Sequence, residues 1–197
     1  MRTVILNLLV AGLFFGLAPN AVSQEETPAS ADPNKTRITL GISSGTPGSA
    51  VVLPIYFTPA AGVSVADVKL EINFVSVNVE LAKLERGLVA ELGAVDLRME
   101  QTHGKNESGV QTTTATITTA PLSTEPPEDG IPIGLLGYLH FRIGEDANPA
   151  KITVRLSAEA TDLKTKQQLP DVLAYGGSIE VDAPGTAPLI ACFFFTH

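Results

Sequence analysis

The sequence predicts an all-β fold, a nine-stranded antiparallel β-sandwich with jelly-roll topology, preceded by a signal peptide. Short segments rich in β-branched and apolar residues follow one another between turns that contain glycine or proline, as is typical of all-β domains. Many of these segments alternate apolar and polar residues, which indicates sheets with one buried and one solvated face. Because no long helical pattern separates them, we expect two packed antiparallel sheets.

Nine segments carry the strand signal. They are residues 36–42, 49–57, 65–74, 77–85, 95–101, 110–119, 133–143, 151–160 and 177–182. Segment 133–143 is almost continuously apolar, which predicts a central strand that is covered on both faces. Residues 87–93 predict one helical turn between the fourth and fifth strands. The prolines of residues 121–132 cannot continue a hydrogen-bonded ladder and predict a loop.

The segments outside the predicted sandwich differ from it in composition. Arg2, an apolar run over residues 4–18 and a small-x-small pattern that ends at Ser23 predict a bacterial secretory signal peptide, cleaved after Ser23. An uncleaved membrane anchor is the alternative. The expected organisation is a signal peptide over residues 1–23, a flexible leader over 24–35, the sandwich over 36–183, and a spacer with an apolar tail over 184–197. We therefore expect a protein that is secreted or held at the cell surface.

Composition excludes two classes of partner. The formal net charge is −8 and only 17% of the residues are charged. Binding to nucleic acid needs a basic face, and docking on an anionic membrane surface needs basic residues too. The chain has one cysteine, Cys192, so no internal disulfide can form.

The sequence contains no pattern of residues that indicates catalysis. Of the three histidines, His103 is expected in a hairpin loop, His140 is expected to be packed and hydrogen-bonded in an apolar strand, and His197 is the last residue. No two of them have metal-ligand spacing, and no Cys/His cluster exists. The serines lack the nucleophile-elbow pattern. We therefore expect a protein that is not an enzyme and needs no cofactor.

Structural calcium is an alternative to the absence of a cofactor. Residues 144–149, with Asp162 and Asp171, offer the oxygen ligands that calcium prefers. Their spacing matches no EF-hand loop. An acidic turn, in which Asp and Asn side chains bond to the backbone, is the favoured interpretation.

Four stretches of the sequence together resemble the cohesin family. They are "ITLGISSGTPGSAVVLPIYFTPAAGV", "VADVKLEINFVSVNVELAKLERG", "IPIGLLGYLHFRIGEDANPAKITVRLSAEATDL" and "YGGSIEV". Cohesins are secreted nine-stranded jelly-roll modules that bind dockerin modules on enzymes in cellulosomes. The resemblance spans roughly residues 37–182 and lies in the order and spacing of elements. The stretch "NFVSVNVEL" lacks the Tyr-Asp-Pro that is usual in the family.

The resemblance implies a non-enzymatic module that binds a protein partner, either dockerin-like or another surface protein. In cohesins the binding face is made by strands three, five, six and eight. Carried onto this chain, that face contains Asp67, Lys69, Glu71, Asn73, Asp96, Arg98, Glu100, Thr112, Thr114, Thr116, Thr153, Arg155 and Ser157. It carries mixed charges and no aromatic side chain of the kind that usually anchors an interface. A solvated sheet face without a partner is the alternative.

Two other functions remain as rivals. A carbohydrate-binding module would bind polysaccharide directly, and such modules stack Trp or Tyr rings on sugar rings. The chain has no Trp, Tyr56 and Tyr138 are expected in the core, and only Tyr175 is expected to be exposed. A glycoside hydrolase is the less favoured rival, because the sequence lacks the aromatic residues that line a sugar cleft.

The tail "PLIACFFFTH" differs from the rest of the chain, since it holds Cys192, Phe193, Phe194 and Phe195 in succession. It is too short to span a bilayer. It could pack on the sandwich as an extra edge strand, or add to a sheet edge of another chain. Alternatively, Cys192 could be a covalent attachment point, because an unpaired cysteine in a secreted protein invites intermolecular pairing.

Overall fold

The computed structural model describes residues 32–93, 95–122, 129–183 and 185. The predicted signal peptide, residues 24–31 of the predicted leader, and the tail with Cys192, Phe193, Phe194, Phe195 and His197 lie outside the described residues. Among the described residues, no helix has the length and apolar character needed to cross a membrane.

The described chain is almost entirely β-structure, which confirms the predicted fold class. The elements are β1 Arg37–Leu40, β2 Ile42–Gly45, β3 Ala50–Thr58, β4 Val65–Val75, β5 Val79–Arg86, α1 Leu88–Leu92, β6 Val95–Lys105, β7 Gln111–Pro121, β8 Gly134–Ile143, β9 Ala150–Asp162, β10 Leu173–Tyr175 and β11 Gly177–Val181. Each of the nine predicted segments contains a strand, and the predicted helical turn is α1. The count rises to eleven because the first segment is broken at Gly41 and the short β10 precedes the last one.

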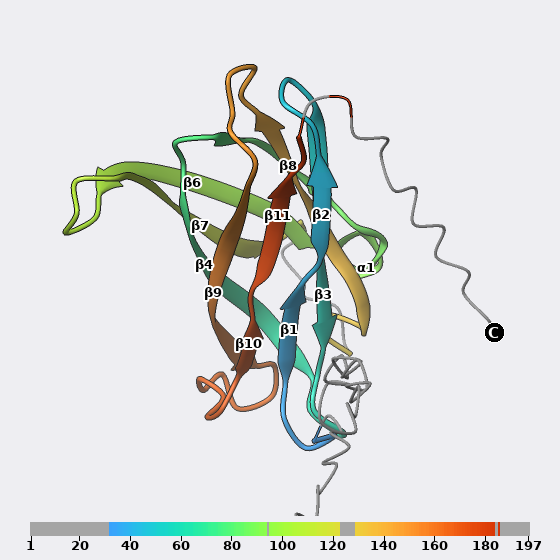
Figure 1. The fold of residues 1–197 in the computed structure, drawn as a ribbon. Coiled ribbons are helices and arrows are strands. Elements are labelled where there is room, and N and C mark those ends of the chain that lie inside the picture. The colour runs from blue at the N-terminus through green and yellow to red at the C-terminus, as the bar shows by residue number, and fades with distance from the viewer. Residues whose placement is uncertain (1–31, 94, 123–128, 184, 186–197) are drawn as a thin grey trace, which may run out of the picture. The chain divides into compact units, whose positions relative to one another are not determined.

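The strands form two sheets that face each other (Figure 1). One has five strands in the order β10-β1-β3-β8-β5, and the other has six in the order β2-β11-β9-β4-β7-β6. The pairing is antiparallel except that β1 pairs parallel with β10, and β2 pairs parallel with β11. The first and last strands therefore run side by side, and both pass from the five-stranded sheet to the six-stranded sheet.

Glycines allow this change of sheet. Gly41 lies between β1 and β2, and Gly176 lies between β10 and β11. A Cβ atom added to Gly177 would overlap the carbonyl oxygen of Gly41, and one added to Gly176 would overlap the carbonyl oxygen of Val154. Only glycine lets two backbones approach so closely. The bend therefore depends on the residue type at these positions.

The core lies between the two sheets and is made by alternate residues of their strands. In β4, Val68, Leu70 and Ile72 are buried, with at most 2% of their surface exposed. Phe74 of β4 meets Phe141 of β8 across the core, with ring centroids 5.2 Å apart and ring planes at 80°. This edge-to-face contact joins the two sheets through their aromatic side chains.

The prediction that segment 133–143 is covered on both faces is wrong. In β8, Leu139 and Phe141 are buried, but Tyr138 and His140 are half-buried and Arg142 is exposed. The strand is central in its sheet, with β3 and β5 as neighbours. It is nevertheless covered on one face only. Its continuous apolar sequence arises because the outward positions also carry large, partly apolar side chains.

The prediction that Tyr56 and Tyr138 lie in the core is also wrong. The alternation of β3 turns Tyr56 outward, where 42% of its surface is exposed, while the neighbouring Phe57 is fully buried. Tyr138 is half-buried on the same outer face of the five-stranded sheet. Tyr175 is 49% exposed, as predicted.

Candidate functional site

The residues predicted for the binding face lie on one face of the six-stranded sheet. The predicted strands three, five, six and eight are β4, β6, β7 and β9, which are neighbours in the order β9-β4-β7-β6. Every predicted residue is exposed or half-buried and alternates with residues turned to the opposite side. These residues are Asp67, Lys69, Glu71 and Asn73 of β4, Asp96, Arg98 and Glu100 of β6, Thr112, Thr114 and Thr116 of β7, and Thr153, Arg155 and Ser157 of β9. We call them the polar face.

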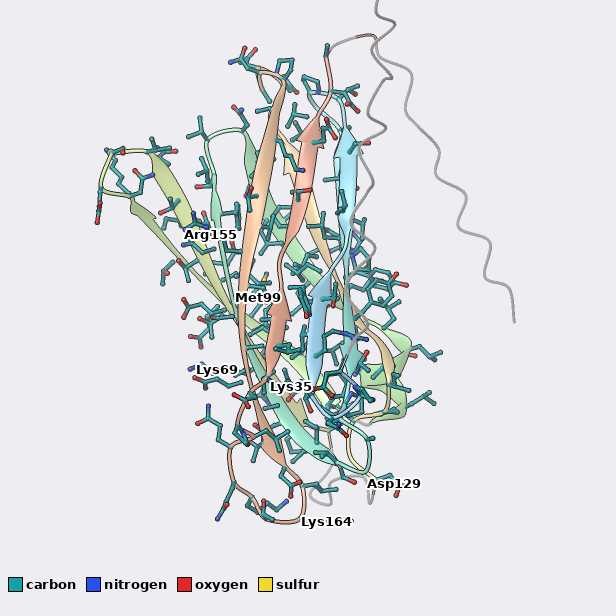
Figure 2. The ribbon with its side chains drawn as sticks, turned by 60° about the horizontal axis from the view of Figure 1, so that its bottom comes forward. Lys35, Lys69, Met99, Asp129, Arg155 and Lys164 are labelled. Atoms are coloured by element: carbon teal, nitrogen blue, oxygen red, sulfur yellow. The ribbon has the colours of Figure 1, made fainter. Side chains whose placement is uncertain are left out.

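The register of the strands arranges the polar face in rows across the sheet, and the rows also contain the neighbouring residues Glu159, Thr118 and Thr102. One row is Glu159–Lys69–Thr118–Arg98, the next is Ser157–Glu71–Thr116–Glu100, and the third is Arg155–Asn73–Thr114–Thr102. Each row thus combines residues of β9, of β4 and of the β6–β7 hairpin. In Figure 2, Lys69 and Arg155 extend from the same side of the molecule.

Short contacts fix some of these side chains. The Asn73 amide Nδ2 donates a hydrogen bond of 2.9 Å to Thr114 Oγ1, and Thr161 Oγ1 donates one of 2.9 Å to Asp67 Oδ1. Lys69 Nζ lies 3.9 Å from Glu159 Oε2. An exposed ion pair of this kind contributes little stability, about 0–1 kcal/mol. The two hydrogen bonds therefore hold the side chains of Asn73 and Asp67 in place, whereas the ion pair adds little stability.

The middle row is acidic and has no cation of its own. Glu71 and Glu100 lie on either side of Thr116, and because neighbouring strands are about 4.8 Å apart, their backbones are about 10 Å apart. The ion pairs found among the described residues involve neither of these carboxylates, nor Arg98 or Arg155. The charges of the central rows are thus available to groups from outside the chain.

The sequence analysis did not predict a hollow at one end of the polar face, which polar and apolar residues line together. The hollow has a volume of about 440 Å³ and lies between the end of β4, the β6–β7 hairpin and the start of β9. Val75 and Val77 line it and are 40% and 60% exposed. Val77 lies in the turn after β4, where no periodicity marks which way a side chain points.

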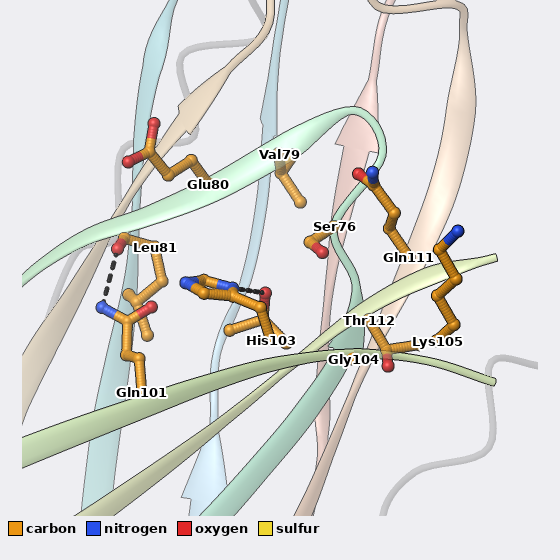
Figure 3. Close-up of a pocket in the computed structure, with 11 residues that line it drawn as sticks. Ser76, Val79, Glu80, Leu81, Gln101, His103, Gly104, Lys105, Gln111 and Thr112 are labelled. Carbon is orange, nitrogen blue, oxygen red and sulfur yellow. Dashed lines mark hydrogen bonds between the residues drawn. The ribbon is translucent and has the colours of Figure 1, made fainter.

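A second hollow of about 550 Å³ lies beside β6 (Figure 3). His103 Nδ1 is 3.0 Å from the hydroxyl of the buried Thr113, and Gln101 Nε2 donates a hydrogen bond of 3.1 Å to the carbonyl of Leu81. The prediction that His103 lies in a hairpin loop is wrong, because β6 continues to Lys105. The His103 contact joins β6 to β7, and the Gln101 contact joins β6 to β5.

Two of the acidic residues considered for calcium, Asp162 and Asp171, contact protein groups. Asp162 Oδ1 accepts hydrogen bonds from the backbone N–H groups of Thr165 and Lys164, at 2.7 and 2.9 Å. The bond from the Thr165 N–H, above all, holds the pKa of the Asp162 carboxyl below its ordinary value. Asp171 Oδ2 lies 3.8 Å from Lys35 Nζ. Within the described residues, no three His, Cys, Asp or Glu side chains lie close enough together to hold a metal ion.

A charged cluster lies on the opposite, five-stranded sheet. Glu85 Oε2 is 2.9 Å from Lys83 Nζ and 3.0 Å from His140 Nε2. The hydrogen bond and the charge of Lys83, followed by the charge of His140, lower the pKa of the Glu85 carboxyl. His140 is half-buried in β8, on the outer face of the sheet, and its Nε2 lies beside the Glu85 carboxylate.

The comparisons with known proteins give matches among solved structures only. No protein-family model matches the chain, and no curated protein matches it. The sixth cohesin of scaffoldin B from Acetivibrio cellulolyticus, solved with a dockerin, has a TM-score of 0.56 and 15% identity over 75% of this chain and 99% of its own. The seventh ScaB type I cohesin from Pseudobacteroides cellulosolvens has a TM-score of 0.56 and 18% identity over 81% and 99%. A type I cohesin–dockerin complex from Clostridium thermocellum has a TM-score of 0.56 and 13% identity over 76% and 100%. The chain therefore has a cohesin-like fold.

Proposed function

We propose that the chain is a non-enzymatic protein-binding module whose docking surface is the polar face. One observation carries the proposal: side chains from β4, from β9 and from the β6–β7 hairpin form one continuous surface, and this chain shares its fold with cohesins solved in complex with dockerins. The partner is a dockerin-like module or another protein outside the cell. The signal-like sequence of residues 1–23 supports a secreted or surface location. The similarity of the fold to that of cohesins supports a link to polysaccharide degradation.

The chemistry of the polar face suits a protein partner. The acidic row with Glu71 and Glu100 lies beside rows that carry Arg98 and Arg155, so a partner with the opposite pattern of charges fits in one register only. Charge patterns of this kind give specificity and fast association more than affinity. Val75 and Val77 add apolar surface at one end, which a partner would bury. Extended strands in a sheet also present these groups on a rigid support.

The proposal is tested by capture of the partner from the native secretome. The full-length chain is immobilised, and the retained proteins are identified by mass spectrometry. Glu71→Arg changes the centre of the polar face, and Glu85→Arg makes the same change of charge on the opposite sheet. We expect one retained protein that the Glu85→Arg variant captures and the Glu71→Arg variant loses.

Two results would overturn the proposal. Equal capture by both variants would mean that the polar face is not the docking surface. Retention of the chain on insoluble polysaccharide, without any protein partner, would instead favour a carbohydrate-binding module.

A further inference from the structure

All three tyrosines of the chain lie on the outer face of the five-stranded sheet. Tyr56 of β3 and Tyr175 of β10 both pair with Thr39 of β1, and paired residues point to the same face of a sheet. Tyr138 of β8 pairs with Pro54 of β3, two residues from Tyr56. Tyr56 and Tyr175 are 42% and 49% exposed, whereas Tyr138 is half-buried. The five-stranded sheet thus presents aromatic side chains, which the polar face lacks.

The two exposed tyrosines are separated by one strand. The sheet order β10-β1-β3 places Thr39 between Tyr175 and Tyr56 (Figure 1). Because neighbouring strands are about 4.8 Å apart, the backbones of the two tyrosines are about 10 Å apart. The residue between them carries only a small hydroxyl side chain. One extended ligand can therefore reach both tyrosines across the sheet.

A groove of about 740 Å³ continues from Tyr56 to the point where β1 bends into β2. Its lining combines hydroxyl groups with apolar side chains, and includes Thr39, Ser43, Ser44, Tyr56, Ile42 and Val52. Ile42 and Val52 are 75% and 37% exposed. Exposed apolar side chains that adjoin one another mark binding grooves, and a few polar groups among them orient the ligand.

The charge of the groove indicates what kind of ligand it suits. Glu180 is the only charged residue among the described residues that line the groove. Its carboxylate accepts strong hydrogen bonds from hydroxyl groups and repels other anions, and the whole chain has a formal net charge of −8. The hydroxyl groups of the lining both donate and accept hydrogen bonds. The lining therefore complements an uncharged ligand that is rich in hydroxyl groups.

We propose that this surface, which we call the tyrosine face, binds a neutral polysaccharide. It consists of Tyr56, Tyr175 and the groove. A sugar ring whose hydroxyl groups lie at its edge exposes C–H bonds above and below, and these pack against the electron-rich face of an aromatic ring. Tyr56 and Tyr175 hold two parts of the sugar chain in this way. The hydroxyl groups of the groove and the Glu180 carboxylate bind the sugar hydroxyls.

This inference is independent of the proposed function. The tyrosine face is centred on β10, β1 and β3, whereas the polar face extends from β9 to β6 in the other sheet. A polysaccharide and a protein partner can therefore be bound at the same time. We expect Tyr56→Ala to capture the same protein partner as the wild type, and Glu71→Arg to bind polysaccharide as the wild type does.

Native gel electrophoresis tests the proposal, with xyloglucan, galactomannan, hydroxyethylcellulose or the acidic polygalacturonate dissolved in the gel. We expect at least one of the three neutral polysaccharides to retard the chain, and polygalacturonate to leave it unaffected. Tyr56→Ala and Tyr175→Ala should each raise the dissociation constant at least about fivefold. Tyr56→Phe keeps the ring, and Thr116→Ala makes a neutral change on the polar face, so both should bind as the wild type does. Absence of retardation by every neutral polysaccharide, or equal retardation of the wild type and Tyr175→Ala, would overturn the proposal.

A second measurement uses the wild type alone. Because the chain has three tyrosines and no Trp, its ultraviolet fluorescence comes from side chains of this one sheet. Titration with the polysaccharide that retards the chain should change this fluorescence and give the same dissociation constant as the gels. Binding without a change in fluorescence would place the polysaccharide elsewhere and contradict the proposal. Loss of a captured protein in Tyr56→Ala would also contradict it, since the tyrosine face would then be a protein-docking surface.

Discussion

Replacing Phe74 and Phe141 by leucine, singly and together, tests how the two sheets are joined. Both rings are buried, with 2% and 1% of their surface exposed, and they meet edge to face at 5.2 Å. Each change removes about three carbon atoms from the core, and at about 0.8 kcal/mol per buried carbon this lowers the free energy of unfolding by about 2–3 kcal/mol. The edge-to-face contact adds a coupling of about 0.5–1.5 kcal/mol.

Urea unfolding of the wild type, both single variants and the double variant gives this coupling as a double-mutant cycle. The double variant should be less destabilised than the sum of the single variants, because the contact is lost only once. Phe57→Leu with Phe74→Leu forms the control cycle, since Phe57 is fully buried but has no ring contact with Phe74. Distant core changes add to within about 0.3–0.5 kcal/mol. A coupling for Phe74 and Phe141 no larger than that of the control would refute their contact across the core.

Three further predictions concern the sheet crossover, the charged cluster and an acidic turn. Gly177→Ala should lower the free energy of unfolding by about 2 kcal/mol or more, because the new Cβ overlaps the Gly41 carbonyl; urea unfolding that matches the wild type would contradict this packing. Because the folded-state pKa of Glu85 is lowered, its ionised form stabilises the fold above the unfolded-state pKa, and this contribution is lost as pH falls through the folded-state value. Lys83→Met removes the main cause and should raise the Glu85 pKa in an NMR titration, whereas an unmoved midpoint would show that Lys83 is not responsible. Asp162→Ala removes the acceptor of two backbone N–H groups, so hydrogen exchange at these amides should become faster, and unchanged protection would mean that the side chain does not hold the turn.

The resemblance to cohesins supplied the four strands of the polar face, and period-two alternation supplied the direction of their side chains. Where one side of a strand is apolar and the other charged, as in β4, the pattern gives both the element and the direction of its side chains. It failed for Tyr56 and Tyr138, because the outward positions of β3 and β8 also carry large side chains such as Val52. When an outward position carries an apolar residue, the alternation of apolar and polar residues is lost, and it no longer indicates which side chains are buried.

The end of the β6–β7 hairpin was missed for the opposite reason. Around His103 the strand extends beyond the core, so neither side of it is apolar and the sequence resembles a loop. The bend at Gly41 was missed because it depends on the approach of Gly177, which is distant in the sequence. Contacts of this kind become visible only when the last strand has been placed beside the first.

The affinity of the captured partner tests the proposed docking surface most directly. Isothermal titration calorimetry gives its dissociation constant for the wild type, for Glu71→Arg and for Glu85→Arg, which change the same charge on opposite sheets. We predict that Glu71→Arg weakens binding at least about tenfold, or about 1.4 kcal/mol, while Glu85→Arg stays within about twofold of the wild type. Binding that is weakened by Glu85→Arg and preserved in Glu71→Arg would place the docking surface on the other sheet and contradict the proposal.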